Sequence, residues 1–112
     1  MSYTFNNCIN LKKINLTSLD TSNLENMEFL FAGCQNLVDI IGLQEINTNS
    51  LKVATGMFLD CTNLQFVDIS SFNFDNLEGQ DGIFVNTKSL QVINLGNCSD
   101  ANSIFNPNEE LN

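Results

Sequence analysis

The chain is 112 residues long, enough for one small domain, and its 43% hydrophobic content is typical of a globular protein rather than a disordered one. Its 13 acidic residues outnumber 4 lysines, and the net charge of −9 argues against binding to nucleic acid or to an anionic membrane surface. No apolar run approaches the roughly 20 residues that cross a bilayer, and residues 1–5 lack the basic and apolar regions of a signal peptide.

The first recurring motif spans residues 5–11, in the tail of a coil before the first strand, and has the pattern Phe-x-x-Cys-x-Asn-Leu. The chain repeats this motif at residues 31–37 and 58–64, and again at 84–90 with Thr87 and Ser89 in place of the cysteine and the asparagine; a partial copy begins at residue 105. The phenylalanines that open the four full copies, at positions 5, 31, 58 and 84, are 26, 27 and 26 residues apart. Self-similarity at such a period predicts a solenoid, in which each copy forms one coil and stacks on the next.

A short strand is predicted next, over residues 11–16. Alternation places Ile14 and Leu16 on one face and Asn15 on the other. The pattern Leu-x-x-Ile-x-Leu returns in each later copy, with one additional residue near Ile41-Gly42. Its apolar members, with the apolar residue that follows three positions on, are Leu11, Ile14, Leu16, Leu19; Leu37, Ile40, Leu43, Ile46; Leu64, Val67, Ile69, Phe72; Leu90, Ile93, Leu95, Cys98. This arrangement matches a leucine-rich repeat, in which one parallel strand per coil lines a curved sheet.

The second half of each copy is predicted to form a short helix or helical turn. Residues 21–23 supply cap-type side chains, and apolar residues follow at helical spacing over residues 24–31. Residues 49–58 repeat the pattern. Gly79 and Gly82 weaken it in the third copy by roughly 1 kcal/mol each, so an irregular turn is expected over residues 77–84. The fourth copy is shortened and ends at residue 104.

These elements together predict an α/β solenoid of the leucine-rich-repeat class, a right-handed coil with one short parallel strand per repeat and helical turns opposite. The whole chain, residues 1–112, forms a single domain of about four repeats. Their approximate limits are 5–30, 31–57, 58–83 and 84–104, with a partial repeat at 105–112. Leucines and phenylalanines at equivalent positions are expected to stack as two ladders in the core. The first residue falls where Met27 falls in the next copy, so the chain opens in mid-repeat and is expected to be a piece of a longer protein.

The motif Phe-x-x-Cys-x-Asn-Leu, followed by the strand and by turns such as residues 19–27 and 57–77, resembles the BspA-like leucine-rich repeats. The resemblance covers roughly residues 1–105. Such repeats occur in bacterial, mycoplasmal and protist surface proteins, several of which act in adhesion. The resemblance therefore implies a cell-surface or extracellular protein that binds a protein partner. The chain departs from the family in lacking a visible secretion signal and a capping module, and in its degenerate fourth repeat.

Candidate chemical groups are few. Cys8, Cys34 and Cys61 recur once per copy, with Thr87 in the fourth, whereas a metal site needs close cysteine pairs. They are expected to be buried free thiols, a disulfide between neighbouring coils being the alternative. The chain has no histidine or arginine and no nucleophile, phosphate-loop or metal motif. We therefore predict that it is not an enzyme and that it binds neither metal nor cofactor.

The outward, concave side of the strands, here called the strand face, is the most informative surface. It is expected to expose Ile41, Phe66 and Val92 beside Asp39 and Asp68. Apolar groups with a polar rim mark binding sites, and solenoids bind partners through such faces. The alternative is that strand propensity alone explains singly exposed apolar residues. The candidate partner-binding residues are Asp39, Ile41, Phe66, Asp68, Val92 and Asn94.

Two functions remain open from the sequence. The first is a noncatalytic protein-interaction scaffold, as part of a cell-surface adhesin, that uses the strand face. The second is a structural repeat fragment that self-associates, because the first and last strands look uncapped and offer open edges. The acidic charge suits a basic protein, a cation or a neutral glycan as partner, and equally a role limited to solubility. No nucleic-acid partner and no membrane-embedded state are expected.

Overall fold

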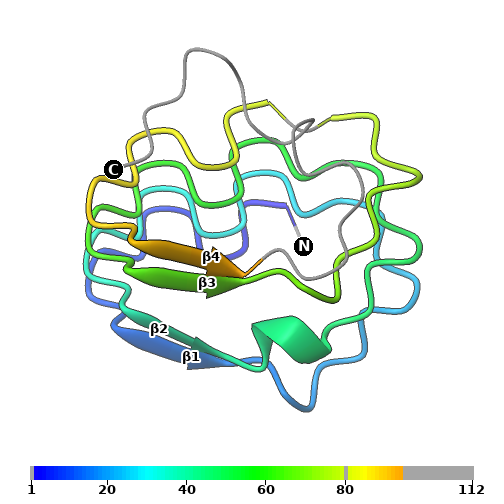
Figure 1. Cartoon of the computed structure of the whole chain (residues 1–112), viewed down its shortest axis with the longest axis horizontal. Helices are drawn as coiled ribbons and strands as arrows, with labels where there is room; N and C mark the ends of the chain where they lie inside the picture. Colours follow the sequence, from blue (N-terminus) through cyan, green and yellow to red (C-terminus); the bar gives the residue numbers. More distant parts are fainter. Residues whose placement is uncertain (1, 80, 95–112) are drawn as a thin grey trace.

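Four three-residue strands recur once per repeat in the computed structural model, which describes residues 2–79 and 81–94. They are β1 (Lys13–Asn15), β2 (Asp39–Ile41), β3 (Phe66–Asp68) and β4 (Val92–Asn94). A 3-10 helix, η1 (Leu43–Glu45), follows β2. β1 pairs with β2 and β3 with β4, both in parallel, and the two pairs form two separate sheets. All four strands lie on one side of the molecule (Figure 1).

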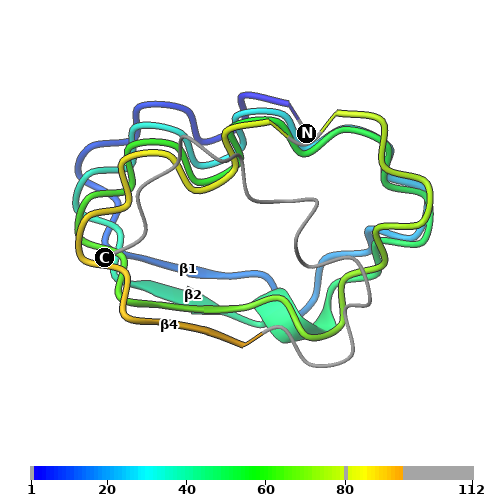
Figure 2. The same ribbon diagram turned by 45° about the horizontal axis from the view of Figure 1, so that its top comes forward.

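Successive repeats run beside one another along most of their length. Figure 2 shows their traces following nearly the same outline. Backbone hydrogen bonds join neighbouring repeats, such as Phe29 N–H to the Thr55 carbonyl at 2.9 Å and Asp60 N–H to the Val85 carbonyl at 3.0 Å. Each repeat therefore satisfies the backbone groups of the next, as the repeat period requires.

The side opposite the strands contains turns instead of α-helices in the described residues. Isolated parallel bridges join Asn26 to Val53 and Val53 to Gly79. The segments that follow these bridges form tight turns. One of them is closed by the hydrogen bond from Leu30 N–H to the Met27 carbonyl at 3.2 Å. Of the two forms predicted for residues 24–31, a short helix or a helical turn, the structure has the turn. The physical reason is that backbone N–H groups of this segment bond to the next repeat, as the Met27 N–H does to the Val53 carbonyl at 2.8 Å. These groups are then not available for the continuous series of hydrogen bonds within the segment that an α-helix needs.

The predicted phenylalanine ladder forms the centre of the core. The ring centroids of Phe5, Phe31, Phe58 and Phe84 are successively 5.6, 5.8 and 5.5 Å apart, and the ring planes differ by only 8°, 12° and 8°. Phe31, Phe58 and Phe84 are completely buried. The leucine ladder lies beside it and is buried at Leu37, Leu64 and Leu90.

The apolar residue three positions after each strand is not equally buried in all repeats. Ile46 and Phe72 are buried, but Leu19 is 44% exposed. β1 pairs only with β2 among the described strands, so the turn after β1 has a neighbouring repeat on one side only. The expected roles of Leu95, Cys98 and residues 97–112 lie outside the described residues.

Candidate functional site

The strand face carries the six candidate residues on three of the four strands. Asp39 and Ile41 lie at the two ends of β2, and the register pairs them with Lys13 and Asn15 of β1. Phe66 and Asp68 of β3 are paired with Val92 and Asn94 of β4. Alternation along each strand turns these side chains outward, as predicted, while Ile14, Ile40, Val67 and Ile93 pack against the core.

The two sheets separate between β2 and β3. Among residues 2–79 and 81–94, no backbone hydrogen bond joins these two strands, although their repeats are bonded on the opposite side, where Ala54 N–H lies 2.7 Å from the Gly79 carbonyl. The wider separation of the two pairs is visible in Figure 1. The repeats therefore stay attached at their backs and part at the strand face.

The turn that follows each strand explains where the sheet is interrupted. In the first repeat the Asn15 carboxamide oxygen accepts hydrogen bonds from the N–H and hydroxyl of Thr17, at 2.9 and 2.7 Å. In the third repeat the Asp68 carboxylate accepts the same two bonds from Ser70, at 3.0 and 2.6 Å. These are Asx turns, which need a side-chain acceptor at the end of the strand.

The second repeat has no such acceptor, because Ile41 occupies the position of Asn15 and Asp68. The chain instead turns through the additional residue, Gly42, with φ of +86°, and enters η1. A Cβ atom at Gly42 would lie 2.9 Å from the Thr17 nitrogen, so the backbone here packs directly on the first repeat. The additional residue follows β2 and leads into η1, at the place where β2 and β3 part.

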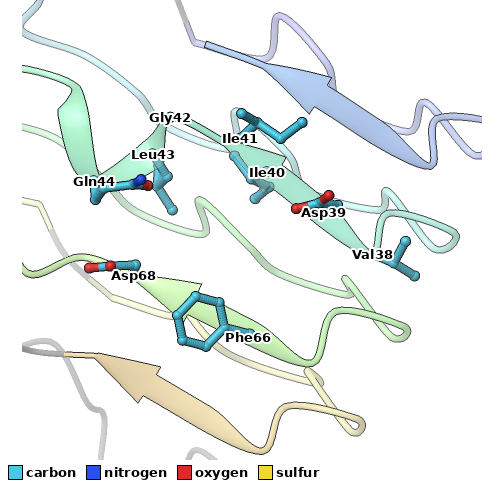
Figure 3. Close-up of a pocket in the computed structure, with 9 residues that line it drawn as sticks. All are labelled: Val38, Asp39, Ile40, Ile41, Gly42, Leu43, Gln44, Phe66 and Asp68. Atoms are coloured by element: carbon cyan, nitrogen blue, oxygen red, sulfur yellow. The ribbon is translucent and has the colours of Figure 1, made fainter. Parts of the chain in front are cut away.

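A pocket of about 320 Å³ occupies the space between the two strands (Figure 3). Its lining comes from both strands and from the turn after β2: Val38, Asp39, Ile40, Ile41, Gly42, Leu43, Gln44, Phe66 and Asp68. We call it the β2–β3 pocket. Phe66 is 53% exposed and Ile41 41% exposed, and Ile40 is only partly buried although it lies inside the array. The pocket therefore combines apolar walls with two carboxylates.

The two carboxylates have different surroundings. The hydroxyl and N–H of Ser70 hold the pKa of Asp68 below its usual range, with a further contribution from the Asn94 side chain. Asp39 lies beside Lys13 in the register of β1 and β2. Within the described strands Lys13 is the one cation, and β3 carries a carboxylate, Asp68, without a cation on the strand itself.

The structure brings four of the six predicted residues, Asp39, Ile41, Phe66 and Asp68, around this pocket. Val92 and Asn94 lie on the far side of β3 and do not line it. Ile40 and Gly42 also line the pocket and were not among the site residues predicted from the sequence. The additional residue near Ile41-Gly42 was the available signal, because a change in repeat length in one copy shifts that copy relative to its neighbour.

The cysteines are placed for packing. The Cys34 thiol donates to the Phe5 carbonyl at 3.0 Å and the Cys61 thiol to the Phe31 carbonyl at 3.1 Å. Both are buried free thiols, as predicted, whereas Cys8 is partly exposed. Burial raises the pKa of Cys34, and it raises the pKa of Cys61 to about 12, which opposes formation of a nucleophilic thiolate.

The described residues contain neither a cluster of metal ligands nor a membrane-spanning helix. No group of three or more acidic, cysteine or histidine side chains there is arranged to hold a metal ion. No helix in that part of the chain has the length and apolarity to cross a membrane.

Comparison with known proteins gives one family. A family model described as "Mycoplasma protein of unknown function, DUF285" matches residues 1–112. Comparisons with curated proteins and with solved structures gave no match.

Proposed function

The chain belongs to the DUF285 family of Mycoplasma proteins of unknown function, and we propose that it is a noncatalytic scaffold that binds a protein partner. In this proposal it is part of a cell-surface adhesin, located at the cell surface or outside the cell. The binding site is the strand face around the β2–β3 pocket. The resemblance to BspA-like surface repeats supports both the location and the adhesive role.

The proposed architecture is a right-handed leucine-rich-repeat solenoid. Its support is the recurrence of one parallel strand per repeat and the stacked phenylalanines of successive repeats. In such arrays each repeat contacts mainly its neighbours, so a change of one residue in one repeat has a local effect. The additional residue of the second repeat can therefore create a pocket without disturbing the rest of the core.

One observation carries the binding proposal: exposed Phe66 and Ile41 stand beside Asp39 and Asp68 at a pocket of about 320 Å³. Binding pockets of this kind are mostly apolar with a few polar groups, and aromatic side chains dominate the binding energy of protein interfaces. The absence of histidine and arginine from the sequence supports a noncatalytic role.

A pull-down from extracts of surface and matrix proteins, and from a cytosolic extract, tests this proposal. The test variant is Phe66→Ser with Asp68→Lys. The matched control is Ile9→Ser with Asp75→Lys, which removes one exposed apolar side chain and changes the charge equally, outside the strand face. Circular dichroism first establishes that both fold.

We expect a surface or matrix protein that is retained by the wild type and the control and lost by the test variant. Retention of every specific partner by the test variant would contradict the strand-face proposal. Recovery of a partner from the cytosolic extract only would contradict the adhesin role.

Self-assembly is the second candidate function. Phe5, Cys8, Leu11 and Ile14 of the first repeat are only partly buried, whereas Phe31, the counterpart of Phe5, is completely buried. Another copy stacked on this repeat would cover these groups and pair with the open edge of β1. Light scattering over a range of concentrations tests this, and a strictly monomeric species at the highest concentration would exclude it for the isolated chain.

A further inference from the structure

The β2–β3 pocket is bordered by two strand edges whose backbone groups have no partner in the described structure. In a parallel pair, alternate residues of a strand bond to each neighbour. Asp39 N–H bonds to the Lys12 carbonyl at 3.3 Å and the Ile41 carbonyl accepts from Leu16 N–H at 2.8 Å, so these residues bond toward β1. The N–H and carbonyl of Ile40 consequently point across the pocket toward β3.

The opposite edge is equally open. The Gln65 carbonyl accepts from Val92 N–H at 3.2 Å, and Ile69 N–H donates to the Asn94 carbonyl at 3.0 Å, so these residues bond toward β4. The backbone groups of Phe66 and Asp68 therefore point toward β2. Unpaired strand edges are templates for another strand, and addition of an extended peptide to such an edge is an established mode of recognition.

We propose that the β2–β3 pocket accepts an extended peptide of the partner as a parallel strand inserted between β2 and β3. This inference rests on the proposed function and specifies the partner. The N–H of the peptide's central residue would donate to the Phe66 carbonyl, and its carbonyl would accept from Asp68 N–H. The residues on either side of it would bond to Ile40. The inserted strand would make one continuous sheet from the two that the structure contains.

The side chains around the pocket specify the peptide's sequence. Aligning the two strands by their repeats sets Asp39 across from Phe66, Ile40 across from Val67, and Ile41 across from Asp68. A central aliphatic residue would join the inward row of Ile40 and Val67. Each outward residue would lie between one carboxylate and one apolar side chain.

A lysine or arginine suits both outward positions. The charged group of such a side chain would pair with the carboxylate on one neighbouring strand. Its aliphatic stem would pack against the apolar side chain on the other strand, or its charged group would lie over the Phe66 ring. The net charge of −9 favours the approach of such a peptide. The predicted occupant is thus a basic–aliphatic–basic segment in extended conformation.

The test uses a fluorescein-labelled peptide, Ser-Thr-Arg-Ile-Arg-Thr-Ser, and fluorescence anisotropy with the full chain. One matched peptide is N-methylated at the isoleucine amide, which keeps every side chain but removes the donor to Phe66. A second has glutamate in place of both arginines. We expect the wild type to bind the first peptide. Its affinity for the N-methylated peptide should be lower by roughly tenfold or more, because a backbone hydrogen bond is lost and the methyl group clashes with the strand edge. The glutamate peptide should not bind.

A protein variant closes the pocket itself. Ile41→Asn combined with deletion of Gly42 makes the second repeat read Ile-Asn-Leu, like residues 14–16 of the first. This restores the side-chain acceptor and the common repeat length, so β2 is expected to pair with β3. The variant should be folded by circular dichroism and should lose peptide binding.

A second measurement does not depend on that variant. Amide hydrogen exchange in the wild type should slow at Ile40 and Asp68 when the peptide is added, and should not change at Val92, whose N–H is already bonded to Gln65.

Equal binding of the methylated and unmethylated peptides, or unchanged exchange at Ile40 and Asp68, would overturn strand insertion. If no peptide binds but the pull-down still recovers a partner through Phe66 and Asp68, the insertion fails and the proposed function stands. If neither experiment gives a partner, both fail.

Discussion

The thiol of Cys61 donates a hydrogen bond to the backbone carbonyl of Phe31, a residue 30 positions earlier, at 3.1 Å. The bond joins a turn of the third repeat to the aromatic ladder of the second. Thr87, at the same position of the fourth repeat, instead bonds to the Phe84 carbonyl of its own repeat at 2.7 Å. In the second, third and fourth repeats this position therefore provides a small buried hydrogen-bond donor, which bonds to the carbonyl of Phe5, Phe31 and Phe84 respectively.

The first prediction concerns pH dependence at Cys61. Burial raises the pKa of Cys61 from its usual value of 9.0 to about 12, so the folded protein keeps the proton at a pH where the unfolded chain has lost it. The resulting stability is fully present below pH 9 and is lost as the pH rises toward 12, by up to about 1.4 kcal/mol per pH unit. Urea unfolding measures the free energy of unfolding of the wild type and of Cys61→Thr at pH 7 to 11. Above pH 9 the wild type should lose stability relative to the variant, because threonine has no proton to lose in this range. A constant difference across this range would contradict it.

The second prediction concerns the aromatic ladder. Phe58 is completely buried and stacks on Phe31 and Phe84, so Phe58→Ala should lower the free energy of unfolding by about 3–5 kcal/mol. The matched control is Phe66→Ala, which truncates the same side chain on the exposed strand face and should change stability by less than about 1 kcal/mol. Chemical denaturation measures both, and similar losses in the two variants would refute the ladder as the centre of the core.

The third prediction concerns the Asx turn after β3. Ser70→Ala removes the hydroxyl that lies 2.6 Å from the Asp68 carboxylate and should cost about 0.5–1.5 kcal/mol at pH 7. Because these bonds lower the pKa of Asp68, their stabilisation is present above pH 4 and is lost as the pH falls through the folded pKa. The cost should therefore shrink in acid. Ser71→Ala, at the exposed neighbouring residue, is the control and should have little effect at either pH.

The fourth prediction separates backbone strain from crowding at Gly42. Gly42 and Gly82 both have positive φ, +86° and +69°. A Cβ at Gly42 would lie 2.9 Å from the Thr17 nitrogen, whereas at Gly82 the nearest atom is 3.6 Å away on Val85. Both alanine variants incur the left-handed penalty of roughly 1–2 kcal/mol, and Gly42→Ala should cost more because backbone atoms must move. Thermal unfolding of the two variants measures the difference, and equal losses would show that the first repeat does not press on Gly42.

Local patterns were sufficient for much of the fold and part of the site. The interval between Phe5, Phe31, Phe58 and Phe84 predicted which rings would stack, and alternation predicted that Phe66 and Asp68 would face outward. Both are confirmed, because each depends only on spacing along the chain. The solenoid class and the binding role of the strand face remain proposals.

The sequence by itself determined the repeat, its ladders and the outward row of side chains, since these follow from periodicity. Only the tertiary structure decided that the sheet is interrupted between β2 and β3 and that the opposite side forms bridged turns in place of helices. Both outcomes depend on hydrogen bonds between residues about one repeat apart. The additional residue at Ile41-Gly42 marks the second repeat as different in the sequence. Whether Ile40 bonds to a neighbour, however, depends on how the turn at Gly42 positions the whole second repeat against the third, which only packing between the two repeats decides.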